Sequence, residues 1–488
     1  MREETAPSPS SHKTTHPLEL PPEILGNIFQ LTVADWEGYT IRRLLLNLCL
    51  VCRSWYDAAL LENRIWGKVV LNTANGDESQ SYEKVVTSLT RAPVAFRAVK
   101  ARFGLRCDCD KPWVHPEGNF VSKCEHQVLV RLAKDGPPLQ HLDMECWTSS
   151  CLERFCQRTR LASGQSRLES LKLTIRFGWI YEDLDHTPLR HIPPLKRLEL
   201  ELLSAVPYEL GDSSPAVLFV SSSIGSSLNS LTITFPAYFE CPDYISNFLS
   251  WCTNLESLTM TYAGPMDNHV PHRLPTTTLP KLKVLSLWGI RPHFDRTALH
   301  YLRTPGLATL TIRVYGYPSP IRDRSPPHTI LDLMQSLEVL QPTSFTLHSL
   351  TLWGDRGKII QMGMEELAGI LAALPSLRYL SLNSIHFDAE QLLEASRRSR
   401  AFAPALEHLD LQGLYREFKL QHLLQFVKDR VGERVVGQGS QLAPALRTLT
   451  LSHWEGATST ALSETYTASP LIPELRTTFG LKIVRTVL

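Results

Sequence analysis

One part of the chain concentrates residue types that bind metal ions. It holds Cys107, Cys109, His115, Cys124 and His126 within a proline-rich segment. Cysteine thiolates and histidine imidazoles are the ligands that zinc prefers in proteins. The spacing of these residues matches no standard zinc finger. We therefore favour a loop-forming insertion with reduced thiols over a zinc site, and we expect no metal or other cofactor.

Familiar catalytic motifs are absent from the sequence. It contains no G-x-S-x-G elbow, no H-E-x-x-H helix and no glycine-rich loop for phosphate. Catalytic residues are sometimes dispersed along a chain, where a motif search misses them. Nothing in this sequence favours an enzyme, however, and we expect a protein without an active site.

Charge excludes one class of partner. The 488 residues carry 50 Lys and Arg against 49 Asp and Glu, a formal net charge of +1. Nucleic-acid binding depends on clustered basic residues, and the longest basic cluster, Arg397 to Arg400, is short and isolated. We expect no nucleic-acid partner and interpret this cluster as the solvated end of a helix.

The sequence also lacks the features of an exported or membrane-bound chain. Met1–His16 is rich in Ser, Thr and Pro without the apolar core of a signal peptide, and no apolar run approaches the roughly 20 residues of a membrane span. The ten Cys show no regular spacing, which fits reduced thiols. We expect a soluble protein of the cytoplasm and/or nucleus, with no membrane partner.

The stretch Leu20–Trp66 is expected to form three short amphipathic helices. Pro21, Pro22 and Glu23 are typical of a helix start, because proline has no N–H to satisfy there and glutamate suits the positive end of the dipole. Apolar residues then recur at helical spacing in two stripes. The first stripe is Ile24, Leu25, Ile28 and Phe29, and the second is Leu44, Leu48, Val51, Cys52, Trp55 and Ala59.

Together the two stripes carry more apolar surface than a core of about 50 residues can cover. The surplus predicts a docking module that binds a partner or an adjoining domain. An alternative remains open, in which the helices only cap the repeats that follow, because terminal repeats need a cap.

The same stretch resembles an F-box. The residues that carry the resemblance are Leu20, Pro21, Pro22, Glu23, Ile24, Ile28, Val51, Cys52, Arg53, Trp55 and Trp66. The link Leu31–Arg43 is longer than usual, and in this the chain is similar to F-box proteins of mushroom-forming fungi. The resemblance implies that the module binds the Skp-type adaptor of an SCF-type cullin ubiquitin ligase. The adaptor-binding residues that it implies are Leu20, Pro21, Pro22, Ile24, Leu25, Ile28, Val51, Cys52, Trp55 and Trp66.

From Leu139 onward the pattern L-x-x-L-x-L recurs eleven times, with Ile or Met allowed at the last position. The copies begin at Leu139, Leu168, Leu195, Leu228, Leu255, Leu282, Leu307, Leu347, Leu377, Leu406 and Leu446. Most steps lie near the period of roughly 20 to 29 residues of leucine-rich repeats. The chain resembles that family, but it lacks the Asn or Cys that usually follows three residues after the last Leu, where Arg176 and Leu203 stand, for example.

This pattern predicts an α/β fold. In each copy the second and third apolar residues, such as Leu198 and Leu200, alternate along a short strand. Stacked strands would make a parallel sheet on the concave side of an irregular leucine-rich-repeat solenoid. Helices would return along the convex side, for which Met364–Leu374 and Ala389–Arg397 are candidates.

The expected domain organisation has four parts. They are a disordered tail at residues 1–16, the F-box-like helical module at 17–70, a connecting segment with a degenerate first repeat at 71–138, and the solenoid at 139–488. Within the connecting segment Ser81–Thr90 is expected to be a helix, and Val94–Phe103 is expected to open the sheet. Leu481–Val484 is expected to close it.

Two steps of 40 residues predict inserted loops. Arg313–Thr346 contains proline-rich turns ahead of a helix around Ile330–Leu340, and Leu411–Ala445 holds a helix at Gln421–Val431 followed by a glycine-rich turn. Loops inserted at one end of a solenoid often carry binding function, whereas others are tolerated insertions. The sequence favours neither interpretation.

Five residues on successive expected strands are candidates for target binding. They are Trp288, Arg313, Trp353, Asn383 and, four residues before Asn383, Tyr379. Neighbouring strands lie about 4.8 Å apart, so these side chains are expected to form one cluster. Trp, Tyr and Arg dominate binding hot spots, which favours contact with a target. In the alternative interpretation the two Trp pack under a neighbouring loop, particularly Arg313–Thr346.

Two functions from different classes follow. The first is a substrate receptor of a cullin ubiquitin ligase, which docks the adaptor through Leu20–Trp66 and holds an unknown target protein on the solenoid. The alternative is a leucine-rich-repeat scaffold, or a regulator of a GTPase or another enzyme, in which the N-terminal helices act only as a cap.

Overall fold

A computed structural model describes residues 20–32, 40–72, 81–102, 127–146, 149–159, 167–176, 192–203, 222–235, 242–262, 277–290, 302–314, 346–354, 360–398, 403–414, 418–436, 446–453, 469–477 and 481–487. The chain divides into two compact units, Met1–Leu173 and Thr174–Leu488, and each is described by itself.

Three helices follow one another near the start of the first unit. α1 spans Pro22–Thr32, α2 spans Thr40–Val51 and α3 spans Arg53–Leu61, and the short helix η2 follows at Asn63–Gly67. The amide groups of Ile24 and Leu25 both donate to the carbonyl of Pro21, at 3.0 and 3.1 Å. The predicted helix start at Pro21, Pro22 and Glu23 is therefore confirmed.

A break at Cys52 separates α2 from α3. Cys52 has extended backbone angles, φ −164° and ψ 174°, and directly precedes α3. The predicted second stripe runs across this point as if the helix were continuous. Because the helix is interrupted, the stripe is divided: Leu44 and Leu48 pack against the core, whereas Val51 at the end of α2 is half exposed.

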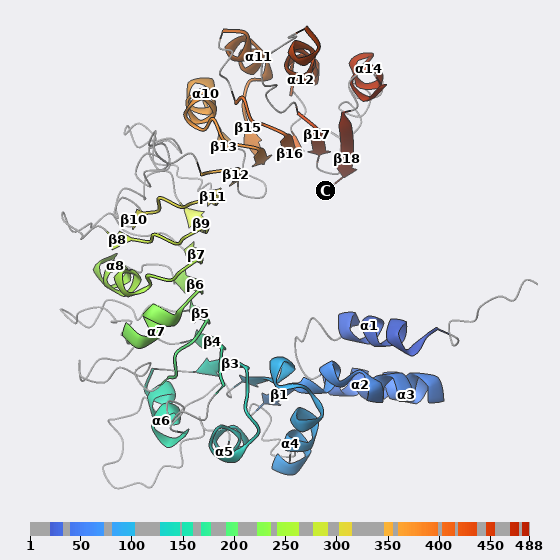
Figure 1. The fold of residues 1–488 in the computed structure, drawn as a ribbon, viewed down its shortest axis with the longest axis vertical. Coiled ribbons are helices and arrows are strands. Elements are labelled where there is room, and N and C mark those ends of the chain that lie inside the picture. The colour runs from blue at the N-terminus through green and yellow to red at the C-terminus, as the bar shows by residue number, and fades with distance from the viewer. Residues whose placement is uncertain are drawn as a thin grey trace, which may run out of the picture. The chain divides into compact units, whose positions relative to one another are not determined.

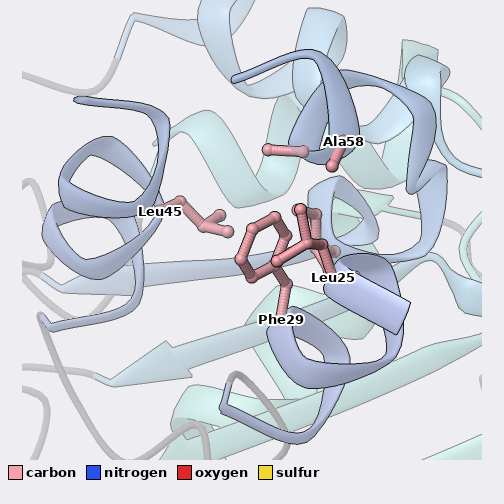
Figure 2. Packing of buried hydrophobic residues seen from close by; sticks show 6 residues of the cluster. Leu25, Phe29, Leu45 and Ala58 are labelled. Carbon is pink, nitrogen blue, oxygen red and sulfur yellow. The ribbon is translucent and has the colours of Figure 1, made fainter. Parts of the chain in front are cut away.

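The three helices enclose a small apolar core, which Figure 2 shows from close by. Its buried members are Leu25, Phe29, Leu45, Ala58, Ala59 and Ile65. Leu25 and Phe29 lie one turn apart on α1 and meet Leu45 from α2 and Ala58 from α3. Since every helix contributes to this cluster, the cluster determines how the helices are oriented relative to one another.

The rest of the first unit alternates strands with helices. The strands are β1 (Lys68–Asn72), β2 (Ala98–Arg102) and β3 (His141–Cys146), and the helices are α4 (Tyr82–Arg91), α5 (Gln127–Asp135) and α6 (Ser149–Thr159). α4 confirms the helix predicted at Ser81–Thr90. The strand predicted at Val94–Phe103 was wrong at its start, because Val94–Phe96 form the 3-10 turn η3 and only β2 pairs, with β1 and β3 in parallel. β1 was not predicted.

Fourteen of the strands that the structure describes form one parallel sheet in chain order. Four strands of two residues each lie outside it: β8 (Thr277–Thr278) pairs with β10 (Leu302–Arg303), and β13 (Ile360–Gln361) pairs with β15 (Ile385–His386), both in parallel. Each L-x-x-L-x-L copy supplies one strand of the 14-stranded sheet. After β3 these are β4 (Ser170–Ile175), β5 (Arg197–Leu202), β6 (Ser230–Phe235), β7 (Ser257–Tyr262), β9 (Val284–Ile290), β11 (Thr309–Val314), β12 (Ser349–Trp353), β14 (Tyr379–Asn383), β16 (His408–Leu414) and β17 (Thr448–His453). The predicted closing strand is confirmed as β18 (Lys482–Val487), which pairs with β17.

The strands of the second unit from β5 to β12 bury one face, whereas β14 and β16 also bury residues of the other face. In β6, Leu231, Ile233 and Phe235 are buried, while Ser230 and Thr232 on the opposite face are only partly covered. Successive side chains of a strand point to opposite faces, so the L-x-L part of the pattern directs both leucines into the core. We call the face opposite these buried side chains the open face.

Helices pack on the buried face of the second unit. They are α7 (Ser222–Ser227), α8 (Pro242–Trp251), α10 (Met364–Ala373), α11 (Ala389–Arg398), α12 (Leu420–Val436) and α14 (Leu471–Thr477). Figure 1 shows α7, α8, α10, α11 and α12 along the same side of their strands. α10 and α11 confirm the two predicted return helices, and α12 is longer at both ends than the predicted Gln421–Val431.

A glycine bulge interrupts the ladder beside the open face. Gly289 in β9 has φ +82°, and the register between β9 and β11 shifts just beyond it. A β-carbon at this position would lie 2.1 Å from the carbonyl oxygen of Tyr262. Only glycine tolerates both the positive φ and this close approach, so the bulge that follows Trp288 in β9 requires glycine at this position.

Several predictions fall on residues outside those described. They concern the tail at residues 1–16, the cysteine and histidine residues at 107–126, the helix at 330–340 and the glycine-rich turn after residue 436. Among the helices that the structure describes, none has both the length and the apolar character needed to cross a membrane.

Candidate protein-binding surfaces

α1 carries apolar side chains on two different faces. Leu25 and Phe29 are fully buried in the helical core. Ile24 and Ile28, each one residue earlier, are 46% and 40% exposed, and Leu31 is 76% exposed. The spacing of Ile24, Ile28 and Leu31 places them on one face of the helix. α1 therefore presents an apolar face that stays largely exposed among the described residues of the first unit.

Exposed apolar side chains are concentrated in these three helices. In the described part of the chain, ten of the fourteen large apolar side chains with high exposure lie between residues 20 and 61. They are Leu20, Ile24, Ile28, Leu31, Leu46, Leu50, Val51, Tyr56, Leu60 and Leu61. Single exposed apolar residues are normal on a protein surface, but such a concentration is typical of an interaction site.

Among the described side chains of α1, α2 and α3, only Glu23, Arg53 and Asp57 are charged. Glu23 lies at the start of α1, and Arg53 pairs with Asp57 at 4.0 Å along α3. Both partners of this pair are largely exposed, so it contributes little free energy. The surface is thus suited to an apolar partner rather than to one selected by charge.

The structure separates the predicted adaptor-binding residues into two groups. Leu20, Pro21, Pro22, Ile24, Ile28 and Val51 are exposed. Leu25 has no exposed surface and packs in the core, and Cys52, Trp55 and Trp66 are partly buried. A side chain without exposed surface cannot touch a partner while the helices keep this arrangement. Leu25 therefore supports the surface from beneath.

Trp55 and Trp66 stabilise the helices through contacts within the chain. Trp55 lies against Phe29, with ring centroids 5.2 Å apart. The indole N–H of Trp66 donates to the carbonyl of Ala59 at 2.8 Å, and the guanidinium of Arg91 lies 5.3 Å from the centre of its ring. Trp66 thus joins α3 to α4, and its main contacts are within the chain.

Six exposed apolar residues were not predicted as part of this surface. They are Leu31, Leu46, Leu50, Tyr56, Leu60 and Leu61. The predicted stripe followed the side of α2 and α3 that packs inward. Apolar residues outside that stripe, such as Leu46 and Leu50, could have indicated the exposed surface. An amphipathic helix that only covers a core is polar at such positions.

A comparison with protein families bears on this region. Residues 18–72 match the F-box-like family. The matched F-box-like region contains α1, α2, α3, η2 and β1, and so includes the whole exposed apolar surface. This match supports the interpretation of the chain as an F-box protein. F-box domains generally bind Skp-type adaptors. No curated protein matches the chain.

A second surface lies on the open face of the second unit. Trp288 of β9 is in register with Arg313 of β11, Arg313 with Trp353 of β12, and Trp353 with Asn383 of β14. The guanidinium carbon of Arg313 lies 5.6 Å from the centre of the Trp288 ring. The sequence thus predicted correctly that these side chains are neighbours. Their role in target binding stays a prediction.

Asn383 and Tyr379 belong to a buried polar network. The carboxylate of Asp410 on β16 accepts hydrogen bonds from Ser381 at 3.1 Å, from the Gln412 amide at 2.7 Å and from the Tyr379 hydroxyl at 3.3 Å. The Asn383 amide donates to Gln412 at 2.8 Å and is 6% exposed. Asn383 therefore stabilises the sheet, and little of its surface is exposed to contact a target.

The described residues contain no group of three or more His, Cys, Asp or Glu arranged to hold a metal ion. Three cysteines of the first unit, Cys146, Cys151 and Cys156, are buried. Burial raises the pKa of the Cys146 thiol well above its ordinary value, with smaller contributions from neighbouring groups. This thiol stays protonated at neutral pH, which disfavours it as a nucleophile or a metal ligand.

Proposed function

We propose that the protein is the substrate-recognition subunit of an SCF-type cullin ubiquitin ligase. The observation that carries the proposal is the exposed apolar surface on α1, α2 and α3, which coincides with the F-box-like region at 18–72. A helical unit of this size leaves ten large apolar side chains exposed, and a bound Skp-type adaptor would cover them.

The adaptor contacts in this proposal come from the exposed residues alone. Ile24, Ile28 and Leu31 on α1 and Leu50 and Val51 on α2 would provide most of the buried apolar area. Leu25, Phe29 and Trp55 would hold these helices in position from within the core. Such a division between contact and support is expected, because a rigid surface loses less conformational entropy on binding.

The second unit would hold the target protein. We interpret it as a leucine-rich-repeat solenoid whose open face is concave, because its strands come from L-x-x-L-x-L copies and its helices lie on the opposite face. Solenoids of this kind offer extended binding surfaces. Ubiquitin transfer would be accelerated by holding the target near a separate conjugating enzyme, with no active site in this chain.

Co-expression with a Skp-type adaptor tests the docking part. We expect a stable complex on gel filtration. Changing Pro22, Ile24 and Ile28 together to serine should weaken adaptor binding by more than about 100-fold, because exposed apolar residues at the centre of an interface carry much of its energy. Circular dichroism should remain unchanged, since all three residues are exposed.

A matched control uses exposed apolar residues of the second unit. Leu203 is 48% exposed and Trp251 is 39% exposed, both outside the F-box-like region. Their replacement by serine should leave the adaptor complex intact. If the unmodified chain fails to co-purify with any Skp-type adaptor, the proposal is wrong, and a cap on the sheet becomes the better account of the N-terminal helices.

A further inference from the structure

Two cysteines stand three residues apart at the junction of α2 and α3. Cys49 lies in the last turn of α2, which ends at Val51, and Cys52 lies between the two helices. Both carry free thiols and are partly exposed. The other cysteines that the structure describes are buried: Cys146, Cys151, Cys156 and Cys252. Within the described part of the chain, Cys49 and Cys52 are therefore the thiols that a dissolved oxidant can reach.

The two thiols differ in their surroundings. Cys49 packs against the helical core, and burial raises the pKa of its thiol above the ordinary value. The thiolate is the form that attacks a disulfide, so burial makes Cys49 slow to react first. The side chain of Cys52 makes no capping hydrogen bond to α3, and its sulfur is not engaged there. This difference assigns the first attack to Cys52 and the second to Cys49.

The spacing of the pair is that of a Cys-X-X-Cys motif, in which two thiols of one chain form a disulfide. Residues three apart on a helix are neighbours, with β-carbons about 5 to 6 Å apart. A disulfide needs about 3.5 to 4.5 Å between the two β-carbons. Cys52 has extended backbone angles and belongs to neither helix. The junction can therefore close the remaining gap without breaking a regular helical turn.

The two residues between the thiols belong to the exposed apolar surface. Leu50 is 80% exposed and Val51 is 50% exposed. The proposed function assigns both of them to the contact with the adaptor. A disulfide between Cys49 and Cys52 encloses Leu50 and Val51 in one covalent ring, and it draws the end of α2 toward the start of α3. Closing the ring thus moves two adaptor contacts at once.

The charge beside the pair favours an anionic oxidant. Arg53 directly follows Cys52, and its side chain is 95% exposed. Asp57 lies 4.0 Å from this guanidinium, in a solvated pair that leaves most of the positive charge open to water. The N-terminus of α3 adds the positive end of its dipole at the same place. Oxidised glutathione, which is an anion at neutral pH, fits this site.

A metal fits the pair less well. A structural zinc site takes four ligands, and two thiols supply only half of them. The described residues contain no group of three or more His, Cys, Asp or Glu that could hold a metal ion. Thiol–disulfide exchange needs two thiols and nothing more from the protein. It is therefore the chemistry that the described side chains at this junction support.

We propose that Cys49 and Cys52 form a reversible disulfide with oxidised glutathione as the oxidant, and that this disulfide weakens adaptor binding. The Cys52 sulfur loses its proton to solvent, attacks one sulfur of oxidised glutathione and releases one glutathione. The Cys49 sulfur, deprotonated in turn, attacks the Cys52 sulfur of the mixed disulfide and releases the second glutathione. The two protein thiols are oxidised by two electrons, and one oxidised glutathione is reduced to two glutathione molecules. The inference rests on the proposed function for its effect on the adaptor.

Peptide mass spectrometry tests the disulfide. Trypsin cleaves after Arg43 and Arg53, so residues 44–53 form one peptide that contains Cys49, Cys52 and no other cysteine. The full chain is incubated with oxidised glutathione, and the remaining thiols are alkylated before digestion. We expect a peptide that has lost two hydrogen atoms and carries no alkyl group. A peptide that is alkylated twice, or one that retains glutathione, overturns the inference.

Single variants test the order of attack. Cys49→Ser should stop the reaction at the mixed disulfide, so that the peptide carries glutathione on Cys52. Cys52→Ser should leave Cys49 alkylated, because burial slows its attack. Glutathione on Cys49 but not on Cys52 would contradict the assigned order. Thermal unfolding of the reduced variants shows whether each one keeps its fold.

Isothermal titration with a Skp-type adaptor tests the regulatory effect. The oxidised chain should bind the adaptor about 10-fold more weakly than the reduced chain, and dithiothreitol should restore the affinity. The control is a Cys49→Ala and Cys52→Ala double variant, whose affinity should be the same before and after treatment with oxidised glutathione. Each comparison is made within one variant, so a change in basal affinity does not affect it. If the alanine pair does not fold, serine at both positions replaces it.

The outcomes separate this inference from the proposed function. An oxidised chain that binds the adaptor as tightly as the reduced chain overturns the inference and leaves the proposed function intact. An equal loss of affinity in the double variant also overturns it, because other cysteines would then be responsible. Failure of the reduced chain to bind any adaptor contradicts the proposed function, whereas the mass of the peptide still decides whether the disulfide forms.

Discussion

Phe29 of α1 packs against Trp55 of α3, with ring centroids 5.2 Å apart and ring planes inclined at 55°. Phe29 is fully buried, whereas Ile28, its neighbour in the sequence, is 40% exposed. The contact therefore fixes which side of α1 faces inward. By doing so it turns Ile24, Ile28 and Leu31 outward together, and it joins the helical core to the proposed adaptor surface.

Phe29→Ala should destabilise the helical module by about 3 to 5 kcal/mol, because it removes a buried aromatic ring and leaves a cavity. Denaturant unfolding followed by tryptophan fluorescence measures the loss. Leu31→Ala, on the same helix but 76% exposed, should change the unfolding free energy by less than about 0.5 kcal/mol. Equal effects of the two substitutions would contradict the assignment of the faces.

The exposed residues Leu50 and Leu61 should contribute to adaptor binding. Leu50 is 80% exposed and Leu61 is 70% exposed, at the ends of α2 and α3. Leu50→Ser with Leu61→Ser should weaken the adaptor complex by at least about tenfold while leaving thermal unfolding unchanged or slightly improved. Isothermal titration with purified adaptor measures the affinity. Unchanged affinity would exclude Leu50 and Leu61 from the contact surface.

Gly289→Ala should destabilise the second unit by about 3 kcal/mol or more. The substitution forces an L-residue to φ +82° and places its β-carbon 2.1 Å from the Tyr262 carbonyl oxygen. Gly363→Ala is the matched control, since Gly363 has φ −63° and no heavy atom within 4 Å of an added β-carbon. Thermal unfolding compares the two variants. A similar melting temperature for both would argue against the bulge described at β9.

Asp410→Ala should destabilise the sheet by about 1 to 3 kcal/mol, because the buried hydroxyl of Ser381 and the amide of Gln412 lose their acceptor. Tyr379→Phe removes only a bond of 3.3 Å from a partly exposed residue, and its cost should be below about 1 kcal/mol. Denaturant unfolding measures both. The reverse order would show that Tyr379 holds the network together.

Acid should destabilise the second unit through His386. Burial lowers the pKa of His386 from 6.5 to about 4 in the folded state. The unfolded chain therefore takes up a proton first as the pH falls, and stability present above pH 6.5 is lost progressively down to about pH 4. His386→Asn should flatten this part of the curve of unfolding free energy against pH.

Much of the fold was predictable from short-range patterns. The L-x-x-L-x-L copies supply eleven strands of the parallel sheet, because alternation of apolar and polar residues is a local property of a strand. The pairing of Trp288, Arg313 and Trp353 across neighbouring strands was also predictable, since each residue occupies the same position in its copy of the pattern. β1 and the turn η3 were missed, because neither carries that pattern.

The candidate sites were predictable only in part. Leu25 and Ile24 are adjacent apolar residues on α1, and nothing in their types shows which one faces the core. Asn383 looks like an exposed polar residue in its strand, yet its amide donates a hydrogen bond to Gln412 of the next strand and only 6% of it is exposed. Such burial depends on residues about 30 positions away in the chain, which a local pattern cannot report.

The sequence by itself determined the elements and their period: three helices with surplus apolar residues, then strands that repeat in chain order. Only the tertiary structure decided which apolar residues are buried and which remain exposed. The physical reason is that burial is a property of neighbours in space. The packing of Phe29 on Trp55, and the interruption at Cys52, assign Leu25 to the core and Ile24, Leu50 and Val51 to the surface.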